Sequence, residues 1–348
     1  MPRCNSAVPP QLVALMVLMS PAASLSSRAA AAPAAAASAA PVAPSKAPSK
    51  AITKDAVERF DVEASDGATI AAWCYPVAEN VSPLGVVMLL HDLGGSHQTV
   101  EPLARALQAA GCVVVAPDLR GHGESRLTSL PSAQDDQSKI LKKADFEMMA
   151  ATRGGRIRDQ SGIRGDVECL RNWVVHETQE GRIPKAPLFV VGSGLGASVG
   201  VHWAAADAAW PDSTSGPQGR QVAGLVIISP GFAVKGFSLG PALATDAIRH
   251  SIPVLVIAGA DDRDAARVFD QLKRLRPREW YDTRRPPSAE KDPSPAKATE
   301  ASLMLFTHPA ARSGDALAAA RSADKAGRAA DPATVVPGFI KVVASRGG

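Results

Sequence analysis

The chain has 348 residues, which is enough for one large α/β domain together with a tail. Its formal charge of +4 resides in residues 1–50, which carry four basic residues and no acidic one, so the remainder holds 34 basic and 34 acidic side chains. A neutral folded part lacks the basic surface that nucleic-acid binding requires, and we expect no nucleic-acid partner.

The N-terminus has the layout of a signal peptide. Arg3 precedes the apolar stretch 12–19, and small residues follow it. The stretch is shorter than the roughly 20 residues that a membrane-spanning helix needs, so we expect no membrane span in the mature chain. We predict a signal peptide over 1–24, a disordered linker rich in Ala, Pro and Ser over 25–52, and export to the periplasm, the cell envelope or the medium. An alanine-rich disordered tail is the alternative interpretation.

The cysteines indicate buried thiols rather than a metal site or a disulfide framework. Cleavage of the predicted signal peptide would remove Cys4 and leave Cys74, Cys112 and Cys169. Their wide spacing matches no zinc pattern, and an odd number excludes complete pairing within one chain. The sequence also shows no phosphate-binding loop and no cofactor motif, so we expect neither a metal nor a cofactor.

Periodic structure begins near Val57. Residues 57–64 and 69–75 alternate between apolar and polar and flank Asp66-Gly67, which predicts a hairpin. Continuous apolar runs then alternate with helical patterns, which predicts a mostly parallel central sheet with helices on both faces. The predicted strands are 86–90, 112–116, 188–191, 224–228, 254–258 and 303–306, and the predicted helices are 100–110, 166–177, 195–206 and 264–275.

Three segments depart from this alternation. Residues 126–162 form a polar insertion with one short apolar patch, and residues 282–298 form a Pro-rich loop. Residues 331–343 have helical spacing, but Pro337 should break or kink that helix. Because only about 25 residues separate the strands 224–228 and 254–258, we expect no large cap domain.

Three motifs follow predicted strands: LLHDLGG at 89–95, APDLRGHGES at 116–125 and GSGLG at 192–196. Together they resemble the α/β-hydrolase superfamily, and most closely its serine aminopeptidase and monoglyceride-lipase-like branch, over roughly residues 57–320. The resemblance implies an α/β-hydrolase fold for residues 53–345 and hydrolysis of an ester or peptide bond. In such sheets the chemistry lies at the carboxyl ends of the strands.

The nucleophile of this family is the central residue of Gly-x-Ser-x-Gly, and in this chain that residue is Gly194. The turn strains the backbone, which costs about 1–3 kcal/mol for a residue with a side chain. Glycine adopts the turn without this cost. Gly194 therefore preserves the turn while the catalytic serine is lost. The neighbouring hydroxyl of Ser193 should point towards the flank of the turn.

The resemblance assigns an oxyanion hole to the backbone N–H groups of Leu93 and Leu195. The family commonly has glycine after the histidine of the first motif, but here that residue is Asp92. A carboxylate that faced inward would oppose a developing oxyanion. An outward orientation is the alternative, and the sequence leaves the orientation open.

The resemblance places the catalytic acid at Asp262, the last residue of Gly-Ala-Asp-Asp after a predicted strand. The alternative role for Asp262 is the N-cap of the next helix. The family histidine should stand where this chain has Arg312 or Ser313. His308 comes about four residues earlier and would reach the site only if the loop were rebuilt.

Our first hypothesis is a degenerate hydrolase that is retained for binding. Its ligand would be a small acyl or peptide-like molecule in the crevice above Gly194. The expected lining is Leu93, Leu195 and the 126–160 segment. Fold analogy supports the crevice, and the missing serine supports the loss of chemistry.

Two alternatives belong to other functional classes. The chain could be an active ester or amide hydrolase that uses Ser193 with Asp262 and His308. It could also be a structural or interaction module of the cell envelope, with the sheet serving as a rigid scaffold. Labelling by a fluorophosphonate probe separates the first alternative from the others.

Overall fold

The computed structural model describes residues 57–78, 81–127, 137–152, 164–212, 214, 219–277, 279–284 and 299–346. They belong to one unit of the chain, Lys50–Gly348. The predicted signal peptide and linker lie outside the described residues, as do much of the 126–162 insertion and most of the Pro-rich loop 282–298. Export therefore stays a prediction.

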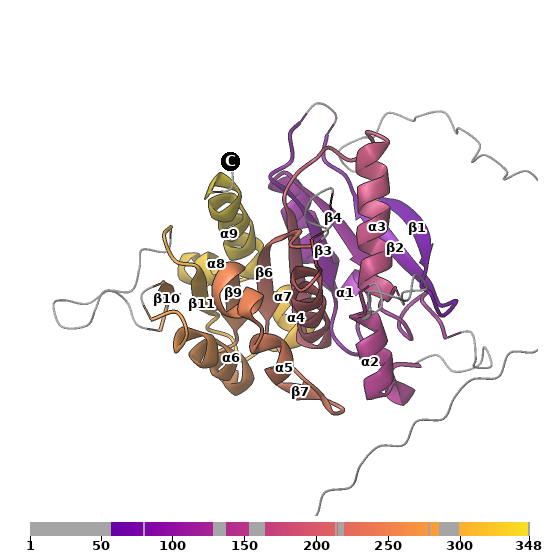
Figure 1. Ribbon diagram of the computed structural model, residues 1–348. Helices are drawn as coiled ribbons and strands as arrows, with labels where there is room; N and C mark the ends of the chain where they lie inside the picture. The colour runs from indigo at the N-terminus through magenta and orange to yellow at the C-terminus, as the bar shows by residue number, and fades with distance from the viewer. Residues whose placement is uncertain are drawn as a thin grey trace, which may run out of the picture. The chain divides into compact units, whose positions relative to one another are not determined.

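Within the described residues, nine strands form one sheet in the order β1-β2-β4-β3-β5-β6-β9-β11-β10 (Figure 1). Strand β2 pairs antiparallel with β1 and β4, and the other neighbours pair in parallel. The strands are β1 Glu58–Glu63, β2 Thr69–Tyr75, β3 Gly85–Leu90, β4 Cys112–Pro117, β5 Leu188–Ser193, β6 Val222–Ile228, β9 Val254–Ala258, β10 Trp280–Asp282 and β11 Leu303–Thr307. The predicted hairpin and mostly parallel sheet are confirmed.

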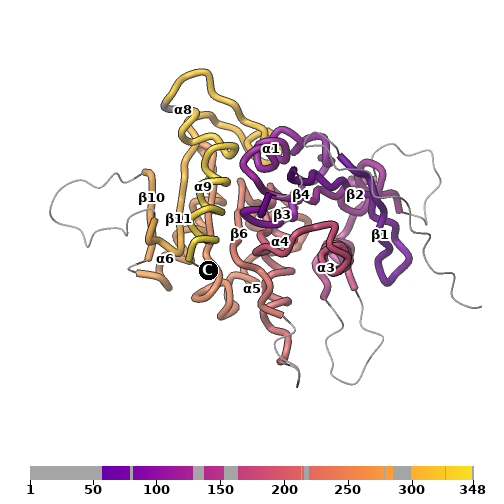
Figure 2. Tube along the Cα trace, turned by 90° about the horizontal axis from the view of Figure 1, so that it is seen from above, coloured from indigo at the N-terminus to yellow at the C-terminus, as the bar shows by residue number. Residues whose placement is uncertain are grey.

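Helices cover both faces of this sheet (Figure 2). Helices α3, α4 and α6 pack on one face, and α1, α7 and α9 pack on the other. The helices are α1 His97–Ala109, α2 Lys143–Met149, α3 Asp166–Gln179, α4 Gly194–Ala208, α5 Gly240–Leu243, α6 Arg263–Lys273, α7 Gly314–Ala318, α8 Lys325–Ala330 and α9 Pro332–Arg346. None of them combines the length and the apolar character that crossing a bilayer demands.

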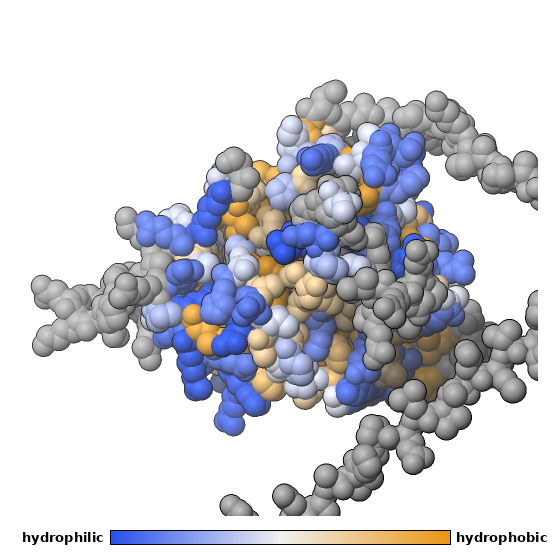
Figure 3. All heavy atoms as spheres, viewed as in Figure 1, coloured by the Kyte–Doolittle hydropathy of each residue, from blue (hydrophilic) through white to orange (hydrophobic). Residues whose placement is uncertain are grey.

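The central strands β3, β4 and β9 are apolar without interruption because both of their faces are buried. Val86, Met88 and Leu90 of β3 join the core on the α4 side, whereas Val87 and Leu89 join the core on the α1 side. A strand covered on both faces cannot alternate with polar residues, since each would lose its hydration. Helix α6 needs only one apolar face, and the surface over it is strongly hydrophilic (Figure 3).

The segment between β6 and β9 is short. It forms the two-stranded hairpin β7 Ala233–Val234 and β8 Phe237–Ser238, helix α5 and a π-helical turn, Ala247–Ser251. These described residues contain no large cap domain, as the sequence predicted. The apolar patch of the 126–162 insertion forms α2, whose Phe146 and Met149 are buried.

Helix α9 corrects one expectation. The helix continues through Pro337, so it does not break there, and of the two predicted effects only a kink stays a prediction. Proline removes one backbone hydrogen bond, but the packing of the helix against the sheet offsets that loss. Val336, Phe339 and Ile340 lie in the core on the α1 side and hold both halves of the helix in place.

Side chains of the motif at 116–125 connect separate segments of the fold through hydrogen bonds. Arg120 Nε donates to both Asp166 oxygens, at 3.1 and 2.9 Å, and Arg120 Nη1 donates to Asp66 at 2.6 Å. The guanidinium thus joins the β1–β2 turn to the start of α3. Asp118 accepts from the backbone N–H of His97 at 2.7 Å, which holds the start of α1.

The strand order positions the site. The chain passes from β3 to β4 on one side and then returns to β5 on the other side of β3. The loops that leave β3 and β5 therefore diverge at the carboxyl edge of the sheet. Such a reversal opens a crevice in which α/β proteins place their ligands.

Candidate functional site

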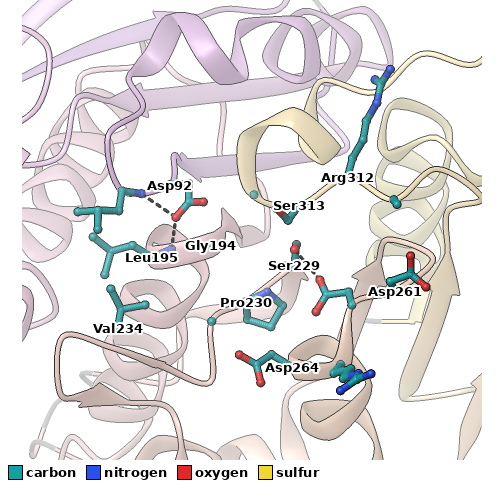
Figure 4. Close-up of a pocket in the computed structure, with 16 residues that line it drawn as sticks. Asp92, Gly194, Leu195, Ser229, Pro230, Val234, Asp261, Asp264, Arg312 and Ser313 are labelled. Carbon is teal, nitrogen blue, oxygen red and sulfur yellow. Dashed lines mark hydrogen bonds between the residues drawn. The ribbon is translucent and has the colours of Figure 1, made fainter.

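A pocket of about 780 Å³ opens at this edge (Figure 4). Its lining comes from five loops at the carboxyl ends of the strands, together with Val234 of the β7–β8 hairpin. The loop residues are Asp92 and Leu93, Gly194 and Leu195, Ser229–Gly231, Asp261–Asp264, and Ala311–Gly314. The described part of the 126–160 segment is absent from this lining, and the rest of the segment lies outside the described residues, so its expected contribution stays a prediction. Val234 reaches the pocket from β7.

The turn at 192–196 has the backbone that the sequence predicted. Gly194 has a φ of +49°, in the left-handed region that disfavours side chains. It begins α4, directly after the extended Ser193. Gly192 and Gly196 serve the close approach of α4 to the sheet, because a Cβ on either would collide with backbone atoms of α4 or β3.

The side chain of Asp92 points into the pocket. The sequence alone did not decide this orientation. Its Oδ1 atom accepts hydrogen bonds from the backbone N–H groups of Leu93 and Leu195, at 2.7 Å each (Figure 4). These are the two donors that the resemblance assigned to an oxyanion hole. A Cβ built on Gly194 or on Gly314 would overlap the carboxylate of Asp92. The carboxylate therefore fills the space beside the turn and bonds to both donors.

Opposing influences act on the pKa of Asp92. Burial raises this pKa, and the charge of Asp315 raises it further. The hydrogen bonds from Leu195 and Leu93 act in the opposite direction because they stabilise the ionised carboxylate. Burial prevails, and the pKa lies above the ordinary value for aspartate.

Asp315 holds this arrangement together, and the sequence analysis did not select it. It accepts hydrogen bonds from Asp92 N at 2.8 Å, from Thr99 Oγ1 at 2.5 Å and from the hydroxyl of Ser193. One carboxylate in the first turn of α7 thus joins the loop after β3, the start of α1 and the end of β5. An Asp near a helix start is common, so the sequence carried no specific signal for this role.

Asp262 is the N-cap of α6, one of the two roles that the sequence considered, and it also belongs to the pocket lining. It lines the pocket, and its Oδ1 atom accepts from Ala265 N at 2.9 Å as the N-cap of α6. Its Oδ2 atom accepts from the hydroxyl of Ser229 at 2.5 Å. Ser229 was not predicted, and its φ of +44° is strained for a residue with a side chain.

His308 is directed to a different partner. It is buried, and its Nε2 atom lies 3.0 Å from Asp331 Oδ1. Its Nδ1 atom accepts from Ala310 N at 3.1 Å, so the proton lies on Nε2 and is donated to Asp331. The ring therefore joins the end of β11 to the start of α9, and it is absent from the pocket lining.

The active arrangement of Ser193, Asp262 and His308 is thus not assembled by hydrogen bonds between these residues. Each of the three bonds to a different partner: Ser193 to Asp315, Asp262 to Ser229 and Ala265, and His308 to Asp331 and Ala310. Sequence spacing could not show the partners Asp315, Ser229 and Asp331, because they come from other loops and elements of the fold.

The position expected for the family histidine lies at the edge of the pocket. Arg312 and Ser313 both line it. The Arg312 side chain extends away from the cavity, whereas Ser313 lies above Ser229 (Figure 4). Among the described residues that line the pocket, none is a histidine. No metal-binding group of three or more His, Cys, Asp or Glu residues occurs in the described part of the chain.

Solved structures with a similar course of the chain include three hydrolases. The esterase Pf2001 of Pyrococcus furiosus is 13% identical, with 84% of this chain and 90% of that chain covered and a TM-score of 0.46. A thermostable carboxyl esterase of Bacillus coagulans is 12% identical, with 83% and 99% covered and a TM-score of 0.47. A putative dienelactone hydrolase of Klebsiella pneumoniae is 15% identical, with 82% and 99% covered and a TM-score of 0.48.

No protein with a curated description matches the sequence. The model of a protein family described as serine aminopeptidase, S33, matches residues 81–274. This range contains more than half of the 348 residues, including the turn at Gly194 and the segment that ends at Asp262.

Proposed function

The chain belongs to the serine aminopeptidase family, and from this premise we propose that it is a member without hydrolytic activity that binds a small molecule in its pocket. One observation carries the proposal. The Asp92 carboxylate bonds to the backbone N–H groups of Leu93 and Leu195 and fills the space that a side chain at residue 194 would need.

Acyl transfer in this family needs a nucleophile, a base and free oxyanion donors. Here Gly194 has no side chain, the described lining has no histidine, and both donors are bonded to Asp92. Loss of the nucleophile alone costs about 10⁶-fold in turnover, and loss of one oxyanion donor costs about 10²–10³-fold. These losses are not additive, but each supports the absence of hydrolysis.

Binding remains physically reasonable because the pocket is still open. Its volume of about 780 Å³ lies within the usual range of small-molecule sites. The lining loops are held by internal hydrogen bonds, including those of Asp315 and Asp262. A pocket that is already formed binds a ligand without the cost of ordering loops.

The first test measures hydrolysis by the unaltered chain. We expect no labelling by a fluorophosphonate probe and no turnover of p-nitrophenyl butyrate above that of the heat-unfolded protein. Labelling that disappears in Ser193→Ala or Ser229→Ala would overturn the proposal, because it would identify a working nucleophile. Labelling that both variants retain would count against the proposal in the same way.

The second test asks what Asp92 prevents. Gly194→Ser alone should stay inactive, because the new side chain overlaps the Asp92 carboxylate and both donors remain occupied. Asp92→Gly with Gly194→Ser and Ser313→His should hydrolyse p-nitrophenyl butyrate slowly. Asp92→Gly with Gly194→Ser is the matched control without a base. Turnover by Gly194→Ser alone would contradict the blocking role of Asp92.

Export remains part of the proposal, on the layout of residues 1–24. It would place the pocket outside the cytoplasm. N-terminal sequencing of the chain recovered from its native host tests this, and we expect a mature end close to residue 25. An intact Met1 in the recovered chain would contradict export by this route.

A further inference from the structure

Three donors at the floor of the pocket are already used within the chain. Asp92 accepts from the backbone N–H groups of Leu93 and Leu195, and Asp262 accepts from the hydroxyl of Ser229. A carbonyl or carboxylate ligand needs such donors. To reach these, it would have to displace a carboxylate that belongs to the same chain. An internal ligand competes at a high effective concentration, so that displacement is unfavourable.

One acceptor at the floor is still available. Asp92 Oδ2 takes no hydrogen bond from the residues that the structure describes, while Oδ1 takes two. Glycines stand on both sides of this carboxylate, and a Cβ at residue 194 or 314 would collide with it. The chain therefore leaves the carboxylate uncovered at two positions where another residue would cover it.

The charge of the lining favours a cationic ligand. The Arg312 guanidinium extends away from the cavity, so it does not neutralise the floor (Figure 4). Asp264 uses one oxygen to accept from Phe232 N at 3.0 Å. The charged lining residues are Asp92, Asp261, Asp262, Asp264, Arg263 and Arg312. Acids exceed bases, and a second anion placed against Asp92 would be repelled.

We propose that Asp92 determines the ligand selectivity of the pocket by closing the two backbone donors to acyl and carboxylate groups and by accepting a cationic hydrogen-bond donor, such as a primary ammonium group, at its second oxygen. The inference rests on the proposed binding function and names its ligand class. Under this inference, the acyl ligand expected from the resemblance is excluded at the floor.

The experiment compares two probes of equal chain length, n-butylammonium and n-butyrate, by NMR titration of the full chain at pH 7.5. We expect n-butylammonium to bind the unaltered chain at least about tenfold more tightly, because hydrogen bonds to charged groups contribute that much. In Asp92→Asn, which keeps the size and removes the charge, the preference should fall below about threefold. In Asp92→Gly the two donors are freed, and n-butyrate should become the preferred probe.

Glu180→Gln is the matched control. It removes one negative charge at an exposed residue that follows α3, outside the pocket lining, and should keep the preference of the unaltered chain. Equal binding of the two probes by the unaltered chain, a preference for n-butyrate, or no uptake of n-butylammonium would overturn the inference. So would a preference that survives in folded Asp92→Asn. Turnover of p-nitrophenyl butyrate is measured separately, since it would overturn the proposed function and not the selectivity.

Discussion

At the scale of single residues, Asp92 and a side chain at position 194 exclude each other. Gly194 lacks the Cβ that would overlap the carboxylate, and Gly314 leaves the same carboxylate free on another side. The glycines at 194 and 314 and the presence of Asp92 are therefore structurally linked, because neither residue 194 nor residue 314 could carry a side chain beside Asp92 in its present position. In this arrangement the backbone N–H groups of Leu93 and Leu195 donate to the protein itself.

The raised pKa of Asp92 predicts how stability depends on pH. Burial favours the protonated carboxyl in the folded state, so this group stabilises the fold most below the ordinary pKa of aspartate, about 3.9. That contribution is lost as the pH rises through the higher folded-state pKa. Asp92→Asn is neutral at every pH, so its stability relative to the unaltered chain should increase from acidic to neutral pH.

Urea unfolding of both proteins at intervals between pH 3.5 and 7.5 checks this. The difference in unfolding free energy between Asp92→Asn and the unaltered chain should rise with pH. A difference that stays constant, or that falls as the pH rises, would contradict the assigned direction of the shift.

At the scale of secondary-structure elements, polar and charged side chains join segments that no hydrophobic pattern brings together. Asp315 connects α7 to the loops that form the pocket floor, and His308 connects the end of β11 to the start of α9. Arg120 connects the β1–β2 turn to α3. Arg120 and Asp166 are both buried, and buried charges are costly, so this pair stabilises the fold only while both partners are present.

Arg120→Met should therefore destabilise the chain by about 3–5 kcal/mol, because it leaves the fully buried Asp166 without its cation. Arg59→Met is the matched control. Arg59 pairs with Asp61 and Glu124, but its side chain is 44% exposed, so its loss should cost no more than about 1 kcal/mol. Equal losses in urea unfolding would show that burial does not decide the contribution of these pairs.

At the scale of the whole molecule, the fold buries the reactive thiol groups together with the hydrophobic core. Cys74, Cys112 and Cys169 are buried and free, as the sequence predicted. Burial raises the pKa of the Cys74 thiol to about 12, and those of Cys112 and Cys169 to about 11. The thiolate is the reactive form, so these groups are inert while the sheet is intact.

The three thiols should consequently report global unfolding. We expect iodoacetamide at pH 8 to modify them at least about 100-fold more slowly in native protein than in urea, because reaction then requires opening of the core. Peptide mass spectrometry resolves each site. Rapid modification of Cys74 in the native chain would contradict its placement between β1 and β4, whereas similar protection of all three would support one cooperative unit.

The family motifs and the apolar runs allowed the fold to be predicted closely. Strand β9 and strand β2 have the predicted ends, and α1 begins three residues before the predicted Val100. Helix ends are less certain because end residues contribute little to packing. The glycines of the turn were interpreted correctly as well, since a left-handed φ at Gly194 is a local property of the backbone.

The sequence by itself thus determined what depends on neighbours along the chain: the strands, the helices, the glycine turn and the absence of a serine at its centre. Only the tertiary structure decided what depends on distant segments. It placed the Asp92 carboxylate where it accepts a hydrogen bond from the N–H group of Leu195. It also paired Ser193 with Asp315 and His308 with Asp331 through hydrogen bonds. The physical reason is that a buried polar group must bond to whichever partner folding brings within about 3 Å, and sequence spacing carries no record of that partner.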